Sequence, residues 1–172
     1  MLIEFRRHEQ VESQAWIHRL DGVVVWLPSY SKKFRVPHDL AHAVTELELG
    51  MPRGVFGSIF SGAIFDNMRV VGGRTRHDAR RVSDRVLRTN REYLRNTEVL
   101  SGVLHHAVEH RLVVPWAMAR AAWGSVNEEP FPWTRADITG ATEQLRALGE
   151  EWATAGSLRL DWPRRLVLPP PR

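Results

Sequence analysis

The dipeptide Asp21-Gly22 constrains the fold of this chain more than any other feature. It separates two apolar runs, residues 14–20 and 23–27. Asp-Gly between such runs is the strongest short-range signal for a β-hairpin, because glycine adopts the positive φ that a tight turn requires. The sequence therefore predicts a pair of antiparallel strands near the N-terminus.

Strand patterns occur at both ends of the chain, with helical patterns between them. Residues 2–8 and 158–162 alternate between apolar and polar side chains, as strands do. In residues 138–152 the apolar positions instead recur every three or four residues, and Thr134 with Asp137 forms a capping box before them. We therefore expect an α+β fold, in which a small antiparallel sheet (N-terminal strand, hairpin and C-terminal strand) is covered by several helices.

The length and composition of the chain set further bounds. The 172 residues contain no internal repeat and no linker, so we expect a single domain over residues 1–172, with 163–172 as a loose tail. The chain contains no cysteine, so any metal must be held by histidine and carboxylate side chains. No apolar run approaches the roughly 18 residues of a membrane span, and no apolar core of a signal peptide follows the N-terminus. We therefore expect a cytoplasmic protein without a membrane partner.

Residues 37–50 predict one helix with two different faces. Pro37 suits the first helical position, and Gly50 suits the residue after the end. The 100° step of a helix places four apolar side chains on the face that we expect to be buried: Leu40, Ala41, Val44 and Leu47. The opposite face carries four side chains suited to metal binding or acid–base chemistry: His38, Asp39, His42 and Glu46.

His38 and His42 lie one helical turn apart, about 6 Å along the axis, which suits two ligands of one ion. With Asp39 between them, they match the spacing of the zincin His-Glu-x-x-His helix, in which two histidines bind zinc and the carboxylate activates a bound water. We therefore expect His38 and His42 to bind a divalent metal, most simply zinc, with Asp39 as base or orienting group. Asp39 is one methylene shorter than glutamate, which weakens the protease analogy but not metal binding. Glu46 is expected to support His42 by accepting a hydrogen bond from its ring.

A second histidine cluster lies in residues 105–110, which contain the inverted zincin pattern His-x-x-Glu-His. If its helix packs beside the first, His106, Glu109 or His110 could supply the third ligand that His38 and His42 lack. The alternative is a solvated face, or a helix end whose dipole favours histidine.

Another His-Asp pair, His77-Asp78, raises the hypothesis of an HD-type phosphohydrolase when taken with His38-Asp39. That all-helical family needs a further helical histidine upstream, where this sequence predicts strands. A capping box of Thr75 and Asp78 at the start of a long helix explains the pair better.

The segment from Arg74 to Arg95 carries eight arginines, a composition that can bind nucleic-acid phosphates. These arginines wrap the predicted helix instead of forming a stripe, and acidic residues interleave with them. We therefore expect a solvated helix and no nucleic-acid partner.

The chain resembles a group of uncharacterised bacterial proteins that share the pattern His-Asp-Leu-x-His-x-x-x-Glu, then Leu-Gly, an aromatic-Gly pair and a further glycine. The matching residues here are His38-Asp39-Leu40, His42, Glu46, Leu49-Gly50, Phe56-Gly57 and Gly62. The resemblance extends upstream to residues 19–22 and downstream to residues 145–162. It singles out the histidines and acids of the 37–50 helix without naming a reaction.

Two functional hypotheses follow. The first is a small metal-dependent enzyme, most simply a hydrolase of a small-molecule or peptide substrate. The second is a non-enzymatic module, in which the histidine and acid face is a structural metal site or a partner surface. A catalytic ion keeps an open coordination position, whereas a structural ion is enclosed by four protein ligands, so the number of further ligands separates the two.

Overall fold

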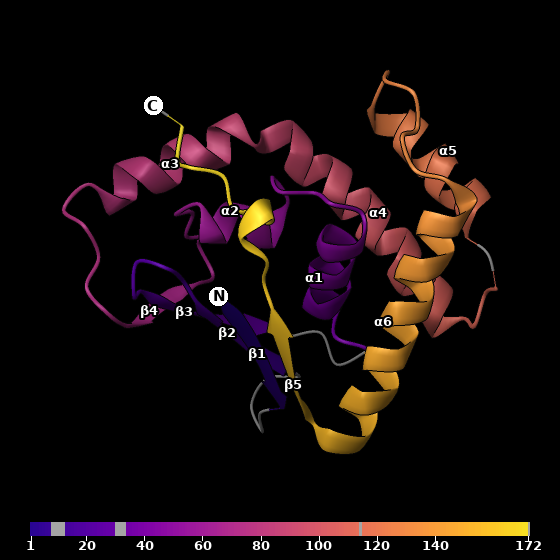
Figure 1. Cartoon of the computed structure of the whole chain (residues 1–172), viewed down its shortest axis with the longest axis horizontal. Helices are drawn as coiled ribbons and strands as arrows, with labels where there is room; N and C mark the ends of the chain where they lie inside the picture. The colour runs from indigo at the N-terminus through magenta and orange to yellow at the C-terminus, as the bar shows by residue number, and fades with distance from the viewer. Residues whose placement is uncertain (8–12, 30–33, 114, 172) are drawn as a thin grey trace.

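A five-stranded antiparallel sheet in the order β4-β3-β2-β1-β5 forms one layer of the protein (Figure 1). The computed structural model describes residues 1–7, 13–29, 34–113 and 115–171. The predicted first strand extended to His8, which lies outside the described residues. The strands are β1 (Leu2–Arg7), β2 (Ser13–His18), β3 (Val24–Ser29), β4 (Arg69–Gly72) and β5 (Ser157–Asp161).

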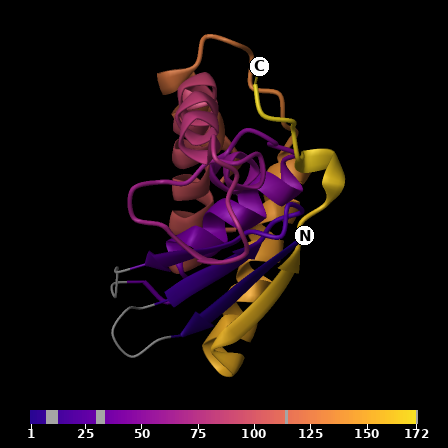
Figure 2. The ribbon, with the colours of Figure 1, turned by 90° about the vertical axis from the view of Figure 1, so that its left-hand side faces the viewer.

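Helices form the second layer and lie on one side of the sheet (Figure 2). Helix α1 occupies the centre of this layer, because it packs against α2, α4 and α6. The α+β fold predicted from the sequence is therefore confirmed, with the N-terminal strand, the hairpin and the C-terminal strand in one sheet. The helices are α1 (His38–Glu48), α2 (Val55–Phe60), α3 (Ala79–Thr89), α4 (Arg91–Glu109), α5 (Trp116–Val126) and α6 (Arg135–Ala155).

The core lies between the sheet and the helices. Alternate residues of β1, β2 and β3 point into it, as the period of two predicts. Phe5 of β1 meets the ring of Phe56 in α2, with centroids 6.1 Å apart. The buried hydrophobic side chains of these three strands are Ile3, Phe5, Ala15, Ile17, Val25 and Leu27.

The predicted hairpin joins β2 to β3, and its loop is longer than a two-residue turn. The last paired residues are His18 and Val24, so residues 19–23 form the loop. Gly22 has φ of 79°, and the Asp21 carboxylate accepts a hydrogen bond from the Val23 amide at 3.2 Å. The predicted hairpin is therefore confirmed: Gly22 supplies the positive φ of the turn, and Asp21 accepts a hydrogen bond from the backbone two residues later.

The structure confirms one of the two helix starts that capping boxes predicted. Thr134 and Asp137 form both hydrogen bonds of the predicted capping box at the start of α6. The second predicted box is wrong, because Asp78 makes no side-chain capping bond and instead pairs with Arg76 at 3.1 Å. The long helix predicted after it is divided at Asn90, which ends α3 and precedes α4.

The segment after β5, which we expected to be loose, begins with a short 3-10 turn, Arg164–Leu166. Leu166 is buried, and its carbonyl accepts a hydrogen bond from the Trp162 indole at 3.3 Å. Trp162 in turn stacks on Phe60, so this segment adds to the core. In the part of the chain that the structure describes, no helix has the length and apolar character needed to cross a membrane.

Candidate metal centre

Helix α1 is buried on nearly all sides, which corrects the two-faced helix predicted from the sequence. Every residue from Leu40 to Glu46 is buried. The reason is the position of α1 between α2, α4 and α6, where the polar side of the helix also meets protein. Leu40, Ala41 and Val44 occupy the core as predicted, but Leu47 is only half-buried. His42 and Glu46 therefore lie at helix–helix contacts and not on a free surface.

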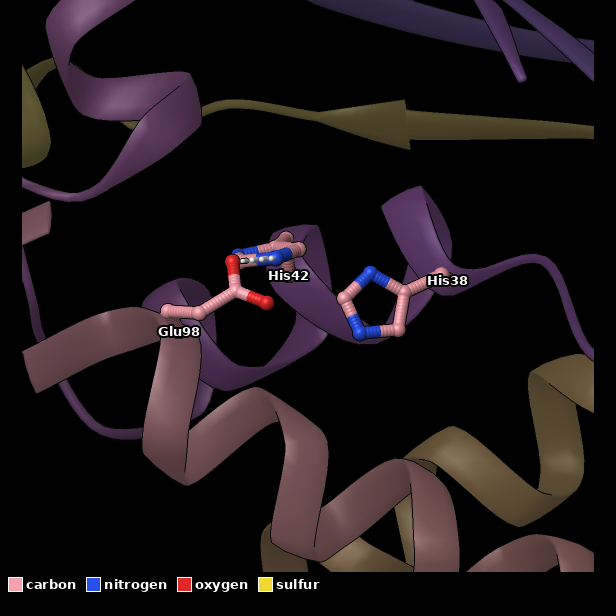
Figure 3. Close-up of side chains that lie close together, drawn as sticks. All are labelled: His38, His42 and Glu98. Atoms are coloured by element: carbon pink, nitrogen blue, oxygen red, sulfur yellow. Dashed lines mark ion pairs between the residues drawn. The ribbon is translucent and has the colours of Figure 1, made fainter. Parts of the chain in front are cut away.

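Helix α4 completes a group of three metal-ligand side chains, because it brings Glu98 to His38 and His42 (Figure 3). One ligand atom from each of these residues lies within 4.8 Å of the other two. The Glu98 carboxylate is 3.1 Å from Nε2 of His42, and the His38 and His42 ring centroids are 4.9 Å apart. His42 is 4% exposed, whereas the Glu98 side chain is 63% exposed, so the group reaches from the interior to the surface.

The two histidines differ in charge because their surroundings differ. Burial opposes a positive charge on His38, and neighbouring His42 adds to this effect, so the pKa of His38 falls to about 4. Burial also opposes a charge on His42, but the hydrogen bond and charge of Glu98 outweigh it, so the pKa of His42 is raised. The hydrogen bond from His42 holds the pKa of Glu98 below its usual value. A metal ion bound here would take the place of the proton between His42 and Glu98.

Ser101 lies beside His42 but does not form a Ser-His-Glu catalytic arrangement. Its Oγ is 3.2 Å from Nδ1 and 3.3 Å from Nε2 of His42. The hydroxyl donates to the Thr97 carbonyl at 2.7 Å, and Ser101 is fully buried. A nucleophile needs a base that accepts its proton and an exposed oxygen, so Ser101 is a packing residue here.

Glu46 has a structural contact that the sequence did not indicate. Its carboxylate accepts hydrogen bonds from the amides of Phe56 at 3.1 Å and Gly57 at 2.9 Å, at the start of α2. This is an acidic cap on the positive end of a helix, provided by another helix. Gly54 makes the approach feasible, because a Cβ there would collide with the Glu46 side chain. Burial raises the pKa of Glu46 to about 7, against the effect of the backbone donors.

Asp39 lies close to the end of β3. The side chain of Ser29, the last residue of that strand, is near enough to the Asp39 carboxylate to lower its pKa. Burial raises the pKa of Asp39, and His42 and Ser29 offset part of this rise. A carboxylate with a raised pKa is a better proton acceptor near neutral pH than an ordinary aspartate.

The second histidine cluster divides between the interior and the surface. His105 is buried, its Nε2–H donates to the Val36 carbonyl at 2.8 Å, and its ring lies 5.2 Å from that of His38. His106 and His110 lie together on the exposed side of α4, with ring centroids 4.2 Å apart. The group of ligand atoms around His38 and His42 contains Glu98 and neither of these two histidines.

Glu98 is the residue that sequence reasoning missed. The hypothesis of a third ligand required the second histidine helix to pack beside the first, and α1 and α4 do pack together. Glu98 lies seven residues before His105, which is close to two helical turns, so both point to the same side of α4. A search for acids one or two turns from His105 on that helix, and not only within the His-x-x-Glu-His pattern, would have found it.

Compared with known proteins, the chain matches no family model, no curated protein and no solved structure. The interpretation of the site therefore depends on its own geometry and chemistry.

Proposed function

We propose that the chain is a metal-dependent enzyme, with a divalent ion such as zinc held by His38, His42 and Glu98. The observation that supports this is the convergence of two imidazoles and one carboxylate, from two helices, within 4.8 Å of one another. Two histidines and one glutamate form a ligand set of catalytic zinc sites, which keep a fourth position for water or substrate. The exposure of Glu98 gives that position a route to solvent.

Hydrolysis is the reaction class that this ligand set suits best. A bound zinc ion lowers the pKa of its water to about 7 and so supplies a nucleophile at neutral pH. In this proposal Asp39 accepts the proton of the attacking water, a role that its raised pKa favours. His105 positions the site, because its bond to the Val36 carbonyl fixes the chain just before α1. The substrate is a small molecule or peptide.

A second function, a structural metal site without catalysis, is favoured by one observation. The ligands come from α1 and α4, and His42 is buried between these helices, so an ion would join them. In that case the metal would contribute to folding stability and Asp39 would have no chemical role.

Glu98→Gln is the variant that tests metal binding, with Glu92→Gln as its control. Both residues are exposed acids of α4, so neither change should unfold the protein. We expect close to stoichiometric zinc in the wild type and in Glu92→Gln after loading and dialysis, measured by elemental analysis. Glu98→Gln should lose about 100-fold or more in affinity, since even groups outside the ligand set contribute about 10–100-fold. Wild-type protein that emerges free of zinc would reject the proposal.

Asp39→Asn separates the enzyme from the structural site. In an enzyme this variant keeps zinc and loses about 100-fold or more of the rate, the usual contribution of a general base. Rates would be measured on the zinc-loaded protein with fluorogenic ester, phosphodiester and peptide substrates. Zinc-loaded wild type without hydrolysis, combined with a large drop in melting temperature on chelation, would instead establish the structural site.

A further inference from the structure

A cavity of about 570 Å³ lies between α6, the end of α4 and the chain before α1, and none of the three metal-ligand side chains lines it. Four arginines line it: Arg7, Arg35, Arg111 and Arg146. Two acids, Glu143 and Glu150, also line it, and Arg35 pairs with Glu109 at 3.6 Å, so positive charge remains in excess. Among the described residues, neither Glu143 nor Glu150 forms an ion pair with any of the four arginines. We propose that this cavity binds a small anionic molecule through its phosphate or carboxylate groups.

Three of these arginines are held in place by carbonyl groups near helix ends. Arg35 donates to the Val108 and Glu109 carbonyls, Arg146 to Leu112, and Arg7 to Trp152 and Ala153, at 3.1–3.3 Å. Each of these bonds uses one Nη2 group of a guanidinium that carries five N–H donors. The remaining donors are fixed in direction, because the side chains are anchored, and guanidinium forks pair with phosphate and carboxylate oxygens in two parallel bonds.

Arg111 lines the cavity from an unusual backbone position. It has φ of 56°, and among the described residues it is the one non-glycine side chain in the left-handed region. Its position explains the backbone: it follows the end of α4, and Leu112 N–H donates to the Ala107 carbonyl at 2.8 Å, as in a helix end where glycine is the usual residue. An arginine there strains the backbone, and it adds a fourth cation to the cavity.

The substitution Arg111→Gly tests this site, because strain and binding predict opposite effects. In the anion-free state glycine relieves the strain, so the melting temperature should rise by about 2–4 °C. With inorganic pyrophosphate the wild type should show a concentration-dependent rise in melting temperature. Arg111→Gly should weaken the apparent affinity by about tenfold or more, the contribution of one charge-assisted hydrogen bond. Citrate in a parallel series distinguishes a carboxylate ligand from a phosphate ligand.

Three controls keep the result specific. The protein is dialysed free of metal and then of chelator before the measurement, so that neither a metal-held anion nor the chelator can mimic or occupy the cavity. Arg74→Ala, an exposed loop arginine outside the cavity, should leave the response unchanged. Sodium chloride at equal ionic strength corrects for general salt effects. Arg111→Lys keeps a charge but not the guanidinium fork, and should weaken binding even if Arg111→Gly fails to fold.

Two outcomes would overturn the proposal. One is a wild type that pyrophosphate and citrate stabilise no more than sodium chloride does. The other is a pyrophosphate response that survives unchanged in both Arg111→Gly and Arg111→Lys.

Discussion

The two histidine pairs of this protein have the same spacing and different surroundings. His38 and His42 on α1, like His106 of α4 and His110 at its C-terminal end, are four residues apart with adjoining rings. The first pair lies between helices, where Glu98 reaches His42, whereas the second lies on the exposed side of α4. Helical spacing therefore offers two ligands in both places. The packing of a second helix decides which pair gains a third ligand.

The strongest test of this comparison replaces one histidine of each pair. His42→Ala should abolish measurable zinc binding, an effect of about 100-fold or more. It should also cost about 2 kcal/mol of unfolding free energy, because His42 is buried. His110→Ala, its matched control, should change stability by less than about 0.5 kcal/mol and leave zinc binding intact. Zinc titration calorimetry and urea unfolding measure both effects.

The expected loss of stability follows from the burial of His42, whereas the sequence placed this side chain on the face opposite the buried one. Equal loss of zinc in His42→Ala and His110→Ala would contradict the distinction between the two pairs.

The pH dependence of stability tests the burial of α1, the helix of the first histidine pair, because burial raises the pKa of Glu46 on that helix. Its pKa is raised from 4.5 in the unfolded chain to about 7 in the folded protein, so between these values the folded state binds more protons. The contribution of Glu46 to the free energy of unfolding is fully present below pH 4.5 and is lost as the pH rises through 7. At 1.36 kcal/mol per pKa unit, the total loss is about 3 kcal/mol. Chemical denaturation from pH 4.5 to 8 measures the loss.

Glu46→Gln is the control for this pH dependence. It cannot titrate, so the difference between its stability and that of the wild type should change over the same pH interval. Parallel curves for the two proteins would show that Glu46 does not titrate there.

The smallest expected effects come from two glycine substitutions, one beside the buried Glu46 and one on α4 between Glu98 and the exposed histidines. Gly54→Ala places a methyl group against the Glu46 carboxyl and should destabilise the protein by about 1–3 kcal/mol. Gly102→Ala, on α4 between the exposed histidines and Glu98, meets no described atom within 4 Å and should stabilise the helix by about 0.5–1 kcal/mol. Thermal unfolding of both variants measures the difference, and a stabilising Gly54→Ala would contradict the close contact with Glu46.

The sequence by itself determined the local elements of this protein. The hairpin at Asp21-Gly22, the capping box of Thr134 and Asp137, and the alternating strands at both ends were recognisable because each depends on neighbours in the chain. The pairing of His38 with His42 was recognisable for the same reason, since it follows from the helical repeat.

Only the tertiary structure decided which acids serve which purpose. Glu46, near His42 in sequence, caps α2, while Glu98, 56 residues beyond His42, completes the group of side chains that could hold a metal ion. The hydrophobic period shows that one side of α1 is buried, but it cannot show that α4 covers the opposite side. Such contacts form between residues far apart in the chain, and they depend on how whole helices pack, which no local pattern encodes.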